Sequence, residues 1–226
     1  TELIQIEALS FQARGWLLFC GFTPTYDAYL TPQHSRAGLA YAKRVLKLLQ
    51  WKNPRQRWLL KSPDAMRYLP QVFDVFPNMQ LIWMHRDPLK TVSSVVSLIG
   101  TILWMRSDQG LDERSTAQLT NPAGLAGLFG MVMDQMDKGL IPESQFRHVQ
   151  YVDFIENPIA TVEKLYGEMG ITMTDAARKA MTDYLTAHPR ESRPAHKYNV
   201  DVAARVSEVR QLFERYQSRF NVKTEV

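Results

Sequence analysis

Two cationic side chains occupy matching places after two short apolar runs, and both could bind an anion. Lys61 follows the apolar residues 58–60, Arg86 comes shortly after 81–84, and each cation is followed two residues later by a proline. Proline is favoured in the first turn of a helix, whose free N–H groups and positive dipole attract anions. A cation at the preceding strand end adds charge-assisted hydrogen bonds at the same place. The spacing therefore predicts two strand-to-helix sites suited to phosphate or sulfate.

The residues around the two cations predict the elements that position them. We expect a short buried strand at 58–61, a helix at 66–76, a second strand at 79–85 and a helix at 88–105. A strand–helix–strand order with this crossover predicts parallel neighbouring strands in a layered α/β fold, which binds ligands beyond the carboxyl ends of its strands. An unpaired lysine at a buried strand end would be costly to desolvate, which favours an anion as the partner of Lys61.

The rest of the sequence predicts further helices and one more strand. Helical periodicity covers residues 2–20, 32–51, 122–138, 158–169, 174–187 and 202–219, and a third strand is expected at 146–152. Loops are expected at 21–31 and 106–121. In the helix at 122–138, the small-residue pairs Ala123/Gly127 and Ala126/Gly130 are expected to allow close packing of a neighbouring helix.

The composition is typical of a soluble globular protein with one substantial core. The chain has 226 residues, 45% of them hydrophobic and 22% charged, with a net charge of +4. A single cysteine excludes an internal disulfide, and the histidines lack zinc-ligand spacing, so no metal is expected. No secretory signal or bilayer-spanning apolar stretch is visible, which makes a cytoplasmic setting the default. Residues 28–63 carry many basic side chains and no Asp or Glu, which indicates a solvated helix face or an acidic partner.

Taken in order, the motifs resemble those of the PAPS-dependent sulfotransferases, in particular a broad and largely bacterial group (PAPS is 3′-phosphoadenosine 5′-phosphosulfate). The resemblance covers roughly residues 55–220. Its anchors are Leu60-Lys61-Ser62-Pro63, Phe76-Pro77, His85-Arg86-Asp87-Pro88, Ser94, Tyr151-Val152-Asp153, Asn157-Pro158 and His196-Lys197-Tyr198.

The resemblance implies a role for each of these residues. Arg86 and Ser94 are implied to hold the 3′-phosphate of the nucleotide, and Lys61 to lie beside the transferring sulfuryl group. Tyr151 is implied to lie near the adenine. The loop of His196, Lys197 and Tyr198 is implied to close over the nucleotide.

The implied architecture is a three-layer α/β fold like that of P-loop kinases, with a parallel sheet flanked by helices. We expect a single sulfotransferase-like domain over 1–226. It would comprise a helical segment at about 1–51, a nucleotide-binding core at about 55–200 and a final helix at about 202–219.

Two departures from the family pattern concern the sulfate end of the site. The family's 5′-phosphosulfate loop and its acidic base are expected upstream of Thr1, so the resemblance implies an N-terminally incomplete domain. Ala65 stands where relatives often carry a histidine. Asp64 and His34 are the local acid–base candidates.

The two residues next to Arg86 in the sequence, His85 and Asp87, are expected to have structural roles and not catalytic ones. Asp87 is expected to be a helix N-cap, because it directly precedes Pro88 at the start of a predicted helix. His85 is expected to be a buried histidine with satisfied hydrogen bonds. Neither is expected to act as the base.

The predicted function is transfer of a sulfuryl group from PAPS to the hydroxyl of a small molecule, either a lipid or a carbohydrate. No nucleic acid partner is expected, and the chain could form a homo-oligomer. One alternative is a phosphoryl transferase of similar fold, which would need a G-x-x-x-x-G-K-[ST] run that these residues do not contain. Another is a non-catalytic module that binds nucleotides or polyanions.

Overall fold

The chain forms two compact units in the computed structural model. The structure describes all residues except 1, 17–22, 106–120, 190–191, 193–205 and 226. The first unit comprises Thr1–Met79 and Val95–Pro142, and the second comprises Gln80–Ser94 and Glu143–Val226. The single domain expected over 1–226 stays a prediction.

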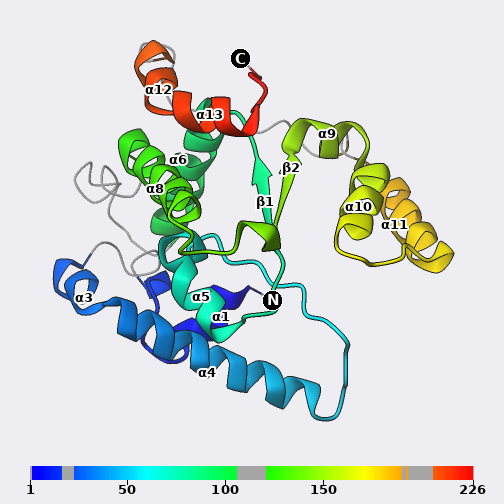
Figure 1. Cartoon of the computed structure of the whole chain (residues 1–226), viewed down its shortest axis with the longest axis horizontal. Coiled ribbons are helices and arrows are strands. Elements are labelled where there is room, and N and C mark those ends of the chain that lie inside the picture. The colour runs from blue at the N-terminus through cyan, green and yellow to red at the C-terminus, as the bar shows by residue number, and fades with distance from the viewer. Residues whose placement is uncertain (1, 17–22, 106–120, 190–191, 193–205, 226) are drawn as a thin grey trace. The chain divides into compact units, whose positions relative to one another are not determined.

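The first unit is built from helices (Figure 1), and they pack around an apolar core. Its elements are α1 (Leu3–Ala8), α3 (Pro24–Tyr29), α4 (Pro32–Gln50), the 3-10 helix η1 (Ala65–Tyr68), α5 (Leu69–Val75), α8 (Pro122–Asp137) and the later part of α6 (Pro88–Trp104). The core cluster consists of Leu3, Ile6, Leu39, Ala42, Leu46, Tyr68 and Val72. Helices α1, α4 and α5 thus bury their apolar stripes against one another.

The helix expected over 2–20 is wrong, because α1 ends at Ala8. The Ser10 hydroxyl donates to the carbonyl of Glu7 at 2.7 Å and accepts from the N–H of Gln12 at 3.3 Å. Such local bonds compete with the helical ladder. Phe11 then adopts a left-handed φ of 55°, which turns the chain out of the helix. Residues 17–20 lie outside the described part, and the loop expected at 21–31 contains the short helix α3.

The buried strand expected at 58–61 is also wrong. Leu59 is 86% exposed, and Trp58 is exposed as well. Lys61 makes an isolated parallel bridge with Glu2, and the Leu3 N–H donates to its carbonyl at 2.8 Å. The apolar run suggested a strand buried on both faces. Among the described residues, however, the β-pairing of this segment is limited to the one bridge between Lys61 and Glu2. The segment is thereby fixed to the start of α1.

The second unit contains a parallel pair of strands with helices after it (Figure 1). Strand β1 (Leu81–His85) pairs with β2 (Phe146–Gln150), in a register from Leu81 opposite Phe146 to His85 opposite Gln150. The helical elements are η2 (Glu143–Gln145), α9 (Tyr151–Glu156), α10 (Pro158–Glu168), α11 (Asp175–Ala187), α12 (Val206–Leu212), α13 (Glu214–Phe220) and the start of α6. The third strand was predicted two residues too long, since Tyr151 begins α9.

A histidine pair lies at the centre of this unit. His85 is 1% exposed, and its Nδ1 lies 3.1 Å from the Tyr216 hydroxyl and its Nε2 lies 2.8 Å from Nδ1 of His148. Trp83 and Phe220 pack against the His85 ring. The expectation of a buried, hydrogen-bonded His85 is confirmed. Burial, with a smaller contribution from His148, lowers the pKa of His85 to about 3.

We expect this pair to make the fold sensitive to acid. His85 titrates at its ordinary pKa of 6.5 in the unfolded chain and at about 3 in the folded one. Between these values the unfolded state binds a proton that the folded state does not, so stability falls as the pH falls from 6.5 to 3. The loss attributable to His85 should be on the order of 3–5 kcal/mol. Urea unfolding of the wild type and His85→Gln at pH 7, 5 and 4 measures it. If His85→Gln is less stable at pH 7 but its free energy of unfolding changes less with pH than that of the wild type, the assignment is supported. Equal changes with pH in the two proteins contradict it.

None of the helices in the described ranges has a stretch both long and apolar enough to span a bilayer.

Candidate functional site

Arg86 and Tyr151, two of the predicted cofactor residues, lie together in the second unit. Arg86 follows β1 directly, and its guanidinium carbon lies 4.1 Å from the centre of the Tyr151 ring. Its Nε and Nη2 donate to the two oxygens of the Glu225 carboxylate at 3.1 and 3.2 Å. The aromatic face and the ion pair hold the guanidinium in one orientation. Arg86 is therefore already bound to an anionic group.

Asp87 fixes the backbone next to Arg86. Its buried carboxylate accepts from the Leu89 N–H at 3.0 Å, which confirms the predicted N-cap of α6. It also accepts from both terminal nitrogens of Arg210 at 2.8 and 2.9 Å and from the Glu225 N–H at 2.7 Å. Burial alone would raise the pKa of Asp87, but these hydrogen bonds, led by the one from Arg210, outweigh burial and lower it.

Ser94 lies on α6, half-buried, seven residues after Asp87. Seven residues are close to two helical turns, so Ser94 lies on the same side of the helix as the cap. That Ser94 and Arg86 together hold the 3′-phosphate of the nucleotide stays a prediction. His196, Lys197 and Tyr198 lie outside the described residues.

Lys61 belongs to the first unit and is more exposed than the sequence suggested. Its side chain is 72% exposed and forms an ion pair with Glu2. Lys61 is therefore neither buried nor unpaired, and the expectation that desolvation forces an anion onto it is wrong. A surface ion pair of this kind contributes little to stability. Its ammonium can consequently exchange Glu2 for another anion at small cost.

The two acid–base candidates from the sequence are both engaged in local structure. His34 takes part in the capping box of α4, whose N-cap is Thr31, and its Nδ1 lies 2.8 Å from the Thr31 hydroxyl. Asp64 accepts from Nε of Arg67 at 2.9 Å. Burial raises the pKa of Asp64, although Arg67 and Arg14 act to lower it.

Sequence reasoning missed a third acid–base candidate, Glu7. It is 3% exposed, and one carboxylate oxygen accepts from the Tyr68 hydroxyl at 3.1 Å. Burial raises the pKa of Glu7 to about 7, the Tyr68 bond lowers it, and the charge of Asp64 raises it. A signal was present in the sequence, because Glu7 lies four and three residues after Leu3 and Ile4 on the apolar stripe of α1. Glu225, by contrast, carries no sequence signal.

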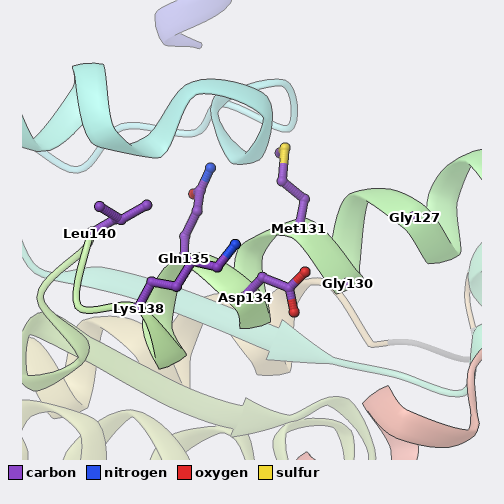
Figure 2. Close-up of a pocket in the computed structure, with 7 residues that line it drawn as sticks. All are labelled: Gly127, Gly130, Met131, Asp134, Gln135, Lys138 and Leu140. Carbon is purple, nitrogen blue, oxygen red and sulfur yellow. The ribbon is translucent and has the colours of Figure 1, made fainter.

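Two cavities open in the first unit. The larger, of about 550 Å³, lies along α8 and is shown in Figure 2, where Gln135 extends from the helix. A side chain added at Gly127 or Gly130 would meet nothing within 4 Å, so the expected close helix packing there is wrong for the described residues. The smaller cavity, of about 260 Å³, is lined in part by Arg14, Tyr68 and Gln135. In the described ranges, no cluster of three or more His, Cys, Asp or Glu side chains could hold a metal.

Comparisons with known proteins agree on one family. The model of the family described as "Sulfotransferase family" matches residues 22–175. The omega-hydroxy-beta-dihydromenaquinone-9 sulfotransferases Stf3 of Mycobacterium bovis and Mycobacterium tuberculosis are each 23% identical over 196 residues, which are 82% of this chain and 48% of the relative. The chain thus spans about half the length of the curated relatives it matches.

Two solved structures share the fold. Sulfotransferase STF9 from Mycobacterium avium superposes with a TM-score of 0.84 at 24% identity, over 100% of this chain and 57% of that one. Sulfotransferase STF1 from Mycobacterium tuberculosis superposes with a TM-score of 0.66 at 24% identity, over 94% of this chain and 54% of that chain. These likenesses confirm the predicted α/β fold with a parallel sheet, and the structure shows that the described part is rich in helices.

Proposed function

The chain belongs to the sulfotransferase family, and from that membership we propose that it transfers a sulfuryl group from PAPS to the hydroxyl of a small molecule. The observation that carries the proposal is the orientation of Arg86, held over Tyr151 and bound to a carboxylate. A guanidinium held in this way offers a planar fork to phosphate oxygens.

In this proposal the second unit binds the nucleotide. The 3′-phosphate would take the place of the Glu225 carboxylate as the partner of Arg86. The Ser94 hydroxyl, on α6, would donate to the same phosphate. Tyr151 would lie beside the adenine. The loop of His196, Lys197 and Tyr198 would cover the nucleotide.

Lys61 would act on the group being transferred. As the acceptor oxygen forms its bond to sulfur, the bond between sulfur and the bridging phosphate oxygen breaks, and negative charge builds on that oxygen. An ammonium placed there stabilises the transition state more than the ground state. The exposure of Lys61 and its weak ion pair with Glu2 support this role. The products are PAP (adenosine 3′,5′-bisphosphate) and the sulfated acceptor.

The acceptor class is proposed from a relative. The name of Stf3 states an omega-hydroxy lipid, and we propose a lipid hydroxyl as the acceptor here, with a carbohydrate hydroxyl as the alternative. A bacterial, cytoplasmic setting stays a prediction.

The test is incubation of the protein with ³⁵S-labelled PAPS and a panel of lipid and carbohydrate alcohols, followed by chromatography of labelled products. Label transferred to an alcohol supports the proposal. Tight PAP binding without transfer to any alcohol would instead favour a non-catalytic nucleotide-binding module.

Because Glu225 occupies the anion position on Arg86, we expect Glu225→Gln to tighten PAP binding. The variant keeps the size of the side chain and the backbone bond to Asp87 but removes the competing charge. The gain should be roughly three- to fivefold, the scale of a partly exposed ion pair. Calorimetric titration with PAP measures it, with Glu163→Gln on α10 as a matched exposed control. Weaker PAP binding in Glu225→Gln would mean that Glu225 supports the site instead of competing for it.

A further inference from the structure

Several buried hydrogen-bond acceptors around Tyr68 have no partner among the described residues. They are Oε1 of Glu7, Oδ2 of Asp64 and Oε1 of Gln135. A buried polar atom without a partner costs about 1–3 kcal/mol, and such atoms are few in native proteins. Their grouping indicates that a donor from outside the described residues completes this region.

A backbone bond places the helix that carries Glu7 next to Lys61. The Leu3 N–H donates to the Lys61 carbonyl at 2.8 Å, which sets the start of α1 against the segment that carries Lys61 and Ser62. Glu7 follows Leu3 by about one helical turn. The Tyr68 hydroxyl reaches Glu7 from η1, so the carboxylate is linked to a residue that lines the smaller cavity.

The walls of that cavity suit a neutral polar group. Its two cationic residues are already paired, Arg14 with Asp27 and Arg67 with Asp64. The other lining residues are uncharged: Leu30, Thr31, Pro32, Ser35, Tyr68, Pro70, Gln71 and Gln135. A volume of about 260 Å³ is below that of most whole-ligand pockets, so the cavity fits one end of a molecule.

We propose that this cavity receives the hydroxyl-bearing end of a neutral alcohol acceptor, and that Tyr68 and Glu7 take up the hydroxyl proton during sulfuryl transfer. The inference rests on the proposed function. Tyr68 is the catalytic residue here because it touches the acceptor. Glu7 acts through Tyr68 as a positioning residue, and its carboxylate accepts the proton that Tyr68 gives up.

The proton and the bonds balance as follows. The acceptor O–H gives its proton to the Tyr68 oxygen, while the Tyr68 proton moves to the Glu7 oxygen that it already contacts. The acceptor oxygen forms its bond to sulfur as the sulfur bond to the bridging oxygen of PAPS breaks, and that electron pair leaves with PAP. Glu7 then returns the proton to solvent.

The groups that face Glu7 suit it to this task. Its pKa is about 7, because burial raises it, the Tyr68 bond lowers it and Asp64 raises it. Asp64 in turn is held by Arg67 and influenced by Arg14. A proton acceptor works best when its pKa lies near the working pH.

The experiment compares Glu7→Gln, Tyr68→Phe and the double variant in sulfuryl transfer from PAPS to 2-phenylethanol between pH 5 and 9. For the wild type, the rate at saturating PAPS should rise with pH and level off above about 7. Each single variant should lose that rise and about 100-fold or more in rate. The double variant should lose no more than either single one, as for groups that act in one relay. Glu163→Gln and Tyr184→Phe, both on exposed positions, are the matched controls.

Two further measurements, thermal unfolding and PAP affinity, distinguish a proton relay from a purely structural role of Tyr68 and from a defect in nucleotide binding. PAP affinity should stay close to wild type in Tyr68→Phe, and thermal unfolding should show a cooperative fold that is less stable by about 1–3 kcal/mol, because the buried ring is kept but Glu7 loses its donor. A Tyr68→Phe variant with unchanged rate and pH profile would overturn this inference alone. Additive losses in the double variant would also overturn it. Failure of the wild type to bind PAP would overturn the proposed function and, with it, this inference.

Discussion

Arg86→Ala is expected to weaken PAP binding by about 2–5 kcal/mol, the usual result of removing one partner of a buried, hydrogen-bonded charge pair. The Arg86 guanidinium lies over Tyr151 and binds one carboxylate through two nitrogens. A phosphate in that place would gain the same two bonds with a higher charge. Arg86→Lys should recover only part of the affinity, because an ammonium cannot offer the planar fork.

Calorimetric titration with PAP measures this effect, and Arg178→Ala is the matched control. Arg178 lies on α11 in an exposed ion pair with Glu163, so its loss should leave PAP affinity within error. Thermal unfolding of Arg86→Ala checks that Asp87 and Glu225 keep the local fold. Equal PAP affinity in the two variants would refute the assignment of Arg86.

The second large effect is expected from Lys61→Ala, which should lower the rate of sulfuryl transfer roughly 10²- to 10³-fold. An ammonium beside the bridging oxygen stabilises charge that exists mainly in the transition state. PAP affinity should therefore change much less than the rate. Because the Lys61 side chain is exposed and paired weakly with Glu2, the substitution should cost little stability.

Single-turnover transfer from PAPS, followed in parallel with PAP titration, separates rate from affinity. Lys47→Ala is the matched control, since Lys47 is exposed on α4 within the same basic stretch. A Lys61→Ala rate equal to that of Lys47→Ala would show that Lys61 has no catalytic role. A loss confined to affinity would place Lys61 in nucleotide binding instead.

Local signals predicted the part of the fold around Arg86 well. The apolar run before His85 gave β1, and Asp87 followed by Pro88 marked the start of α6. Both depend on interactions between residues close in the sequence, namely strand burial and an N-cap. A parallel sheet is present, but its pair is not the predicted one: among the described residues β1 pairs with the later strand β2, whereas the helical crossover had predicted a partner at 58–61.

Features that depend on distant residues were not predictable in this way. The run at 58–60 is apolar enough for a buried strand, yet Leu59 is exposed, because burial depends on which elements cover the segment. Glu225 meets Arg86 across 139 positions, and Tyr68 meets Glu7 across 61. No local pattern encodes such contacts, although a glutamate on the apolar stripe of α1 was a visible irregularity.

The most direct test of the central claim, that Arg86 binds the 3′-phosphate of the sulfuryl donor, compares PAP with adenosine 5′-monophosphate, which lacks that phosphate. Calorimetric titration of the wild type and Arg86→Ala with both nucleotides isolates the contribution of one phosphate. We expect the wild type to bind PAP at least about 30-fold more tightly than the monophosphate, and Arg86→Ala to bind the two almost equally. Equal affinity of the wild type for both nucleotides would contradict the claim.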